Sequence, residues 1–166
     1  MKKWFEKKHE RHKKHEKHVT PGILGHAFEE RVRRAFESNS YALIRKNYVI
    51  NNYGFEQSNA TKRELDLVML RVPHKQVYII ECKAHESEDN LVSLDNVRGF
   101  KQKIINYNGL SANSLLVTDT DFSNSAASFC YQNNIELMNG ERFRRMEREG
   151  SILTMMIMRT AGSLIQ

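Results

Sequence analysis

The fold of this chain is decided by residues 64–83, which read ELDLVMLRVPHKQVYIIECK. Residues 65–70 and 77–82 are two short, nearly continuous apolar runs, and the pair Pro73-His74 between them is typical of a turn. Runs of this length and composition favour strands over helices. The pattern therefore predicts two buried strands that are joined by a short turn.

Charged side chains interrupt both apolar runs. Asp66 lies inside the first run, and Glu81 and Lys83 lie at the end of the second. Residues two apart project from the same face of a strand, and a hairpin would place Asp66 close to Glu81. Burying a carboxylate is costly unless something compensates its charge. We therefore expect two carboxylates and one amine to converge at one edge of the sheet.

This group of side chains suits a hard divalent cation. Mg²⁺ takes oxygen ligands and needs only one or two protein carboxylates in addition to water and phosphate. Asp66 and Glu81 would supply these ligands, with the main-chain carbonyl of Cys82 as a third. Lys83 would orient or deprotonate the attacking water and stabilise developing charge. The alternative is a structural ion pair at a strand end, but the three residues together favour a metal site for phosphodiester hydrolysis.

The rest of the sequence surrounds this hairpin with further helices and strands. Helical spacing of apolar residues predicts four helices, over residues 21–38, 94–108, 121–133 and 141–148. Three more strands are expected, over residues 41–50, 114–118 and 135–138. Residues 151–158 fit either a strand or a helix. This order predicts an α/β sandwich, a central mixed β-sheet flanked by helices on both faces.

Positive charge is concentrated at the beginning of the chain. The formal net charge of the 166 residues is +6, and residues 1–20 contribute +5 of it through eight lysines and arginines against three glutamates. We interpret these residues as a basic arm that contacts DNA phosphates without base specificity, through Lys7, Lys8, Arg11, Lys13 and Lys14. One alternative is a surface metal site formed by its four histidines, which are spaced three residues apart. Another is an arm that has no role in binding. A membrane-surface or acidic-protein binder would explain only this arm.

Cysteine usage and hydropathy indicate the compartment. Cys82 and Cys130 are the two cysteines, and the charged first twenty residues lack the apolar core of a secretory signal. No apolar stretch approaches the roughly 20 residues that span a bilayer. We therefore expect a cytoplasmic protein with reduced thiols and no membrane association.

The acidic residue followed by Glu-x-Lys after an apolar strand is similar to the motif of PD-(D/E)xK nucleases, with Leu65 in place of the usual proline. Residues 25–32, GHAFEERV, resemble the first-helix motif of Mrr-like restriction endonucleases and archaeal Holliday-junction resolvases. In those families the glutamate after the phenylalanine reaches the metal site. The matching residue is Glu29, and Glu30 is a second candidate.

The C-terminal half also resembles the Mrr-like domain. Residues 115–126, LLVTDTDFSNSA, match its strand and following helix start, and residues 135–140, IELMNG, match its end. The resemblance covers about residues 22–147. Mrr-like proteins often carry a glutamine in the helix after Glu-x-Lys, which makes Gln102 a possible site residue.

The resemblance implies a restriction-endonuclease-like fold over residues 21–166, preceded by the basic arm of residues 1–20. It implies an endonuclease that hydrolyses DNA with Mg²⁺ or Mn²⁺ as cofactor and forms a homodimer. A Holliday-junction resolvase with the same site is one alternative. A DNA-binding protein that retains the fold without activity is another.

Overall fold

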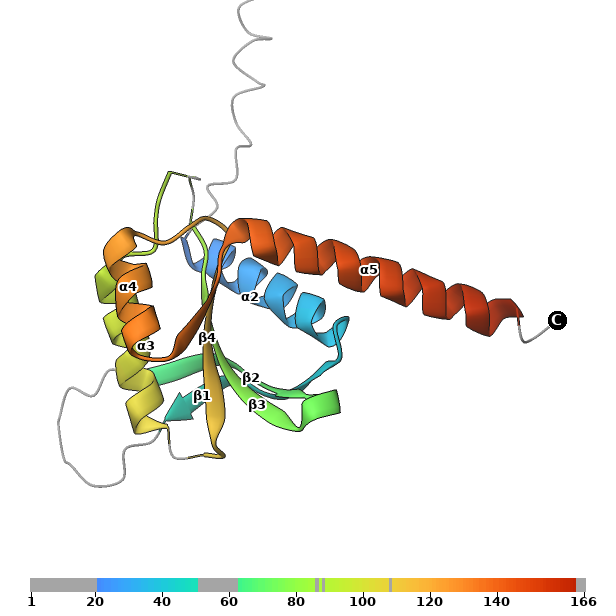
Figure 1. Cartoon of the computed structure of the whole chain (residues 1–166), viewed down its shortest axis with the longest axis horizontal. Helices are drawn as coiled ribbons and strands as arrows, with labels where there is room; N and C mark the ends of the chain where they lie inside the picture. The colour runs from blue at the N-terminus through green and yellow to red at the C-terminus, as the bar shows by residue number, and fades with distance from the viewer. Residues whose placement is uncertain (1–20, 51–62, 86, 88, 108, 164–166) are drawn as a thin grey trace, which may run out of the picture.

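The computed structural model describes residues 21–50, 63–85, 87, 89–107 and 109–163 (Figure 1). The basic arm and the expected loop after residue 50 therefore lie outside the described residues. The elements follow one another as α2 (Pro21–Glu37), β1 (Tyr41–Ile50), β2 (Arg63–Arg71), the 3-10 turn η2 (Val72–His74), β3 (Gln76–Lys83), α3 (Leu94–Asn106), β4 (Ala112–Thr118), α4 (Asn124–Gln132), β5 (Ile135–Met138) and α5 (Gly140–Ser163).

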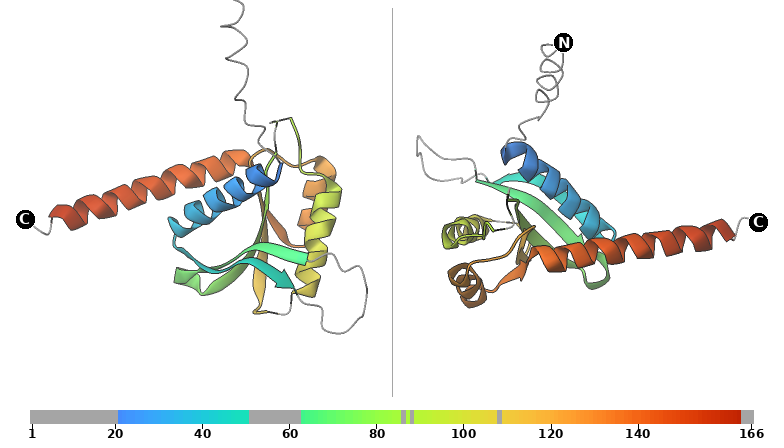
Figure 2. Two further views of the ribbon diagram at one scale, coloured as in Figure 1. Left: turned by 180° about the vertical axis from the view of Figure 1, so that it is seen from behind. Right: turned by 90° about the horizontal axis from the view of Figure 1, so that it is seen from above.

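The described strands form one mixed sheet in the order β1-β2-β3-β4-β5. The pairs β1–β2 and β2–β3 are antiparallel, whereas β3–β4 and β4–β5 are parallel. Helices α2 and α5 cover one face of the sheet, and α3 and α4 cover the other (Figures 1 and 2). The predicted α/β sandwich with a central mixed sheet is confirmed.

The central hairpin of β2 and β3 forms where the apolar runs predict it. Leu67 pairs with Ile80 and Val68 pairs with Ile79 in the antiparallel register. The turn η2 contains Pro73, whose fixed φ suits the start of a short helical turn, and Lys75 closes it with a left-handed φ of 52°. Because both faces of this hairpin are covered by helices, its paired segments 67–70 and 77–80 consist of apolar residues alone.

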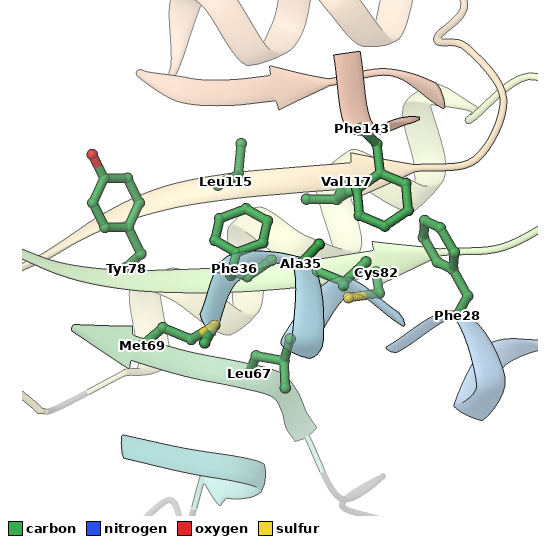
Figure 3. Packing of buried hydrophobic residues seen from close by; sticks show 12 residues of the cluster. Phe28, Ala35, Phe36, Leu67, Met69, Tyr78, Cys82, Leu115, Val117 and Phe143 are labelled. Atoms are coloured by element: carbon green, nitrogen blue, oxygen red, sulfur yellow. The ribbon is translucent and has the colours of Figure 1, made fainter. Parts of the chain in front are cut away.

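Two hydrophobic clusters lie on opposite faces of the sheet. The cluster beneath α2 and α5 contains Leu67, Ile80 and Cys82 from the hairpin, and Figure 3 shows it around Phe36 and Phe143. The cluster beneath α3 and α4 is formed by residues of the hairpin and of these helices, among them Leu65, Val68, Val77, Ile79, Phe100, Ala126 and Cys130. Both cysteines are therefore buried free thiols.

The C-terminal helix differs from the expectation. A short helix over 141–148 and a separate, ambiguous segment over 151–158 were predicted, but α5 runs without a break from Gly140 to Ser163. Gly150 does not end this helix. A Cβ at this position would lie 2.8 Å from the Cβ of Ser38, so the glycine allows α5 to pass close to the turn after α2. The second half of α5 extends beyond the sheet (Figures 1 and 2).

Among the described residues, no helix has both the length and the apolar character that are needed to cross a membrane.

The packing of α5 on the sheet yields a test of the fold. Phe143 is fully buried, and its ring packs edge-to-face against Phe28 of α2 at a centroid distance of 5.2 Å. We expect Phe143→Ala to lower the free energy of unfolding in urea by about 3–5 kcal/mol, because it leaves a cavity between α2, α5 and the sheet. Tyr131→Ala is the matched control, since Tyr131 is 88% exposed and its loss should change stability by less than about 0.5 kcal/mol. Equal losses in the two variants would contradict the packing described for α5.

Candidate functional site

The acidic residues of the hairpin lie side by side where β2 begins and β3 ends. Continuing the register one step beyond the Leu67–Ile80 pair places Asp66 opposite Glu81. The backbone N–H of Cys82 donates a hydrogen bond of 2.7 Å to Oδ2 of Asp66, which fixes the carboxylate against the neighbouring strand. Glu81 lies on the face covered by α3 and α4, because it alternates with Ile80 and Cys82 of the opposite cluster. Asp66 is close enough for its charge to interact with those of Glu81, Lys103 and Lys83.

Glu81 is the most completely buried charged residue described. It is 1% exposed, and its carboxylate is held by two lysine ammonium groups. Nζ of Lys83 donates to Oε1 at 2.8 Å. Nζ of Lys103, which comes from α3, lies 2.7 Å from Oε1 and 2.8 Å from Oε2. The carboxylate therefore stays buried because two cations from different elements meet on it.

Burial and neighbouring charges shift the pKa values of Asp66 and Lys83. Burial raises the pKa of Asp66 to about 7, and the negative charge of Glu81 adds to this increase, while the Cys82 N–H opposes it. Burial alone would lower the pKa of Lys83, but its interactions with Glu81 outweigh burial and raise the pKa. Burial and the negative neighbour thus favour the protonated carboxyl form of Asp66, whereas Lys83 is held in its protonated form by Glu81.

The donor set of this group fits a hard divalent cation. Within the described ranges, no cluster of three or more His, Cys, Asp or Glu side chains is arranged to hold a metal ion. A Mg²⁺ site does not require one, because Mg²⁺ keeps several waters and takes one or two carboxylates plus substrate phosphate. Asp66 and Glu81 offer oxygen ligands only. Their mutual repulsion is relieved by a cation placed between them.

The first-helix glutamates occupy different environments. Glu29 is 14% exposed at its side chain, and its Oε2 lies 3.3 Å from Nδ1 of His26. Burial raises the pKa of the Cys82 thiol, and the charges of Asp66 and Glu29 add to the increase, so Glu29 lies within electrostatic reach of the strand end. Its carboxylate makes no hydrogen bond with Asp66, Glu81 or Lys83 in the described part of the chain.

Glu30 is turned toward other cations. Its carboxylate forms ion pairs with Arg33 at 2.6 Å, Arg34 at 3.0 Å and Lys46 at 3.6 Å. The hydrogen bond from Arg33 is the largest influence, and together these cations lower the pKa of Glu30 to about 2. The structure thus engages Glu30 in a surface ion network rather than bringing it to Glu81.

The side chain that α3 contributes to the site is Lys103 rather than Gln102. Gln102 is exposed, and its backbone carbonyl accepts a hydrogen bond from Asn106. Helix α3 begins with a capping box in which Ser93 and Asn96 bond reciprocally, and it buries Val97 and Phe100. Lys103 follows Phe100 by three residues and therefore shares its face. This spacing is the sequence signal that could have identified Lys103.

A second polar group secures the end of β3, and the sequence patterns did not reveal it. Thr118, at the end of β4, is fully buried and donates from Oγ1 to the carbonyl of Lys83 at 2.8 Å. The N–H of His85 donates to the carboxylate of Asp119 at 3.1 Å, and Nδ1 of His85 lies 3.3 Å from Oγ1 of Thr120. These bonds fix the backbone on which Glu81 and Lys83 lie.

Comparison with known proteins connects this geometry to a family. The family model Mrr_cat, described as restriction endonuclease, matches residues 22–146, which contain every element from α2 to the first part of α5. No curated protein sequence matches the chain.

Solved structures with low sequence identity are similar to this one. A protein of unknown function designated AF1548 is 21% identical with a TM-score of 0.53, over 68% of this chain and 57% of that protein. Protein VC1899 from Vibrio cholerae is 15% identical with a TM-score of 0.50, over 80% of this chain and 33% of that protein. A repair endonuclease from Pyrococcus abyssi is 14% identical with a TM-score of 0.44, over 64% of this chain and 41% of that chain. The chain therefore spans 33–57% of the length of these proteins.

The raised pKa of Asp66 predicts a pH dependence of stability. Between about pH 4 and pH 7 the unfolded chain loses the Asp66 proton while the folded chain keeps it, so folding becomes less favourable as the pH rises. Relative to Asp66→Asn, we expect the free energy of unfolding of the unmodified protein to fall by roughly 3 kcal/mol across this window, without divalent metal. Asparagine retains an acceptor for the Cys82 N–H.

Urea unfolding of both proteins in EDTA, at half-unit pH steps, measures this difference. Contributions from the Glu81, Lys83 and Lys103 groups that face Asp66 largely cancel in the comparison. Parallel pH profiles for the two proteins would show that Asp66 ionises normally in the fold.

Proposed function

The chain belongs to the restriction endonuclease family of the Mrr type, and from this premise we propose that it is a Mg²⁺- or Mn²⁺-dependent endonuclease that hydrolyses DNA phosphodiester bonds. The observation that carries the proposal is the pairing of Asp66 and Glu81 across β2 and β3, with Lys83 bonded to Glu81. A structural role requires no pair of facing carboxylates inside an apolar sheet, because their desolvation and mutual repulsion oppose folding.

In the proposed mechanism, Asp66 and Glu81 would hold the ion together with the main-chain carbonyl of Cys82, and Glu29 would support the site from α2. The bound ion would polarise the phosphate and activate water. Asp66 must lose its proton to serve as a ligand, and the positive charge of the ion favours that loss. Water and substrate phosphate would complete the set of oxygen ligands.

In this mechanism Lys83 would act as a hydrogen-bond donor. Because Glu81 stabilises its protonated form, Lys83 suits donation of a hydrogen bond to the attacking water or to the phosphate, rather than removal of a proton. A fixed ammonium group stabilises charge that accumulates on the phosphoryl oxygens during hydrolysis. The Thr118 hydroxyl bond to the Lys83 carbonyl holds the backbone from which this side chain projects.

The proposal extends to the partners of the protein. DNA is favoured as the substrate because the family is one of restriction endonucleases. The residues assigned to phosphate contact, Lys7 to Lys14 in the basic arm, lie outside the described part of the chain. We also propose that the protein forms a homodimer and acts in the cytoplasm.

Cleavage of supercoiled plasmid with Mg²⁺ or Mn²⁺ tests the function directly. We expect nicking and linearisation by the unmodified protein, and a reduction of roughly 100-fold or more in Asp66→Asn, Glu81→Gln and Lys83→Met, because each change removes a ligand or a fixed charge. Glu136→Gln is the matched control, since Glu136 is an exposed acid on β5 and should leave the rate unchanged.

Single-stranded DNA and a four-way junction serve as parallel substrates. Preference for the junction would favour the resolvase alternative within the same chemistry. Failure of the folded, unmodified protein to cleave any of these substrates with either ion would contradict the proposed activity and favour a DNA-binding protein.

A further inference from the structure

We propose that Lys103 is a second functional cation of this site, which neutralises Glu81 until a divalent ion binds and then contacts the phosphate of the bound nucleic acid. This inference rests on the proposed nuclease function. It assigns a role to a side chain from α3, an element outside the hairpin that carries Asp66, Glu81 and Lys83.

The contacts of Lys103 place it in competition with a metal ion. Its Nζ lies 2.7 Å from Oε1 and 2.8 Å from Oε2 of Glu81, so it occupies the position between the two carboxylate oxygens. Lys83 reaches Oε1 alone. A cation that takes Glu81 as a ligand would meet the Lys103 ammonium group at both oxygens. Binding of the ion therefore requires Lys103 to move, whereas Lys83 can keep a bond to one oxygen.

The position of Lys103 permits this movement. Its side chain is 23% exposed, while that of Glu81 is 2% exposed, so the lysine lies at the outer side of the buried carboxylate. Four methylene groups link the ammonium to α3, and rotation about their bonds can move the charge without shifting the helix or the sheet. Glu81, by contrast, projects from a central strand that is paired on both sides.

The charges of the four residues explain why the displaced cation is useful. With all four groups ionised, Asp66 and Glu81 balance Lys83 and Lys103, and the site is neutral without metal. A divalent ion makes the same group doubly positive. The pentacovalent transition state of phosphodiester hydrolysis carries more negative charge than the substrate, so a site with this surplus favours the transition state. Lys103 would contribute half of the lysine charge to that surplus.

A solely structural ion pair between Lys103 and Glu81 gives opposite expectations. If Lys103 only compensated the buried carboxylate, its removal would leave metal affinity unchanged or weaken it through local disorder. If Lys103 competes with the ion, its removal leaves the ligands in place and takes away a repulsive charge. Metal affinity measured without DNA therefore separates the two roles.

The first experiment titrates the full chain with Mn²⁺ by calorimetry in the absence of DNA. We expect Lys103→Met to bind Mn²⁺ roughly tenfold more tightly than the unmodified protein, because a positive charge beside the ion has been removed. Lys103→Arg retains the charge and should bind with nearly unmodified affinity. Lys101→Met is the matched control, since Lys101 lies on the same helix and forms no ion pair among the described residues. Circular dichroism and urea unfolding verify that each variant is folded.

The second experiment measures binding of a duplex in Ca²⁺ by fluorescence anisotropy. We expect Lys103→Met to bind the duplex several-fold to tenfold more weakly, with a smaller salt dependence, because one phosphate contact is lost. Lys101→Met should retain most of the affinity.

The outcomes distinguish this inference from the proposed function. Equal or weaker Mn²⁺ binding by folded Lys103→Met would overturn the competition between lysine and metal, even if the unmodified protein cleaves DNA. Tighter Mn²⁺ binding with unchanged duplex affinity would overturn the phosphate contact. Absence of DNA cleavage by the unmodified protein would count against the nuclease proposal. The Mn²⁺ titration would still decide whether Lys103 competes with the metal ion for Glu81.

Discussion

The carboxylate of Glu81 imposes the constraint on which the rest of the structure depends. It is almost fully buried in the central strand β3, where a charge is tolerated only with close counter-charges. Lys83 supplies one from the same strand, and Lys103 supplies the other from α3. Helix α3 must therefore pack on the sheet in the position and orientation that bring the Lys103 ammonium group to the Glu81 carboxylate on β3. Its capping box and its buried Val97 and Phe100 hold it in that place.

The same constraint leaves the two acids unequal. Glu81 has two ammonium partners, whereas Asp66 has the Cys82 N–H and a negative neighbour. The site thus combines one carboxylate that two lysines neutralise with one carboxyl group whose pKa is raised to about 7 by burial and by its negative neighbour. A divalent ion is the species that stabilises both together, because it replaces a single positive charge with a double one at the point where the acids meet. The polar bonds of Thr118 and Asp119 keep the strand end in register for this purpose.

Local sequence patterns predict the part of this arrangement that depends on local structure. The apolar runs on either side of Pro73 predict the hairpin, which places Asp66 close to Glu81, and the alternation of side chains places Glu81 and Lys83 on one face. Lys103 was not predicted: its spacing from Phe100 places it on the buried face of α3, but its contact with Glu81 depends on where that helix packs along the sheet. The continuous helix α5 was missed for a related reason. Gly150 is typical of a helix end, but here it permits close packing against the turn after α2.

The strand order has a consequence for how the charges of the site come together. Each strand of the sheet lies beside its neighbour in the sequence, so pairing can proceed strand by strand along the chain. The hairpin of β2 and β3 has the most local pairing of all, and it already contains both acids. We expect the carboxylates to meet early in folding, before α3 delivers Lys103. The later docking of that helix would then be favoured by attraction between Lys103 and the negative charge of the hairpin. The acids proposed to bind the metal would thus also help to position α3 during folding.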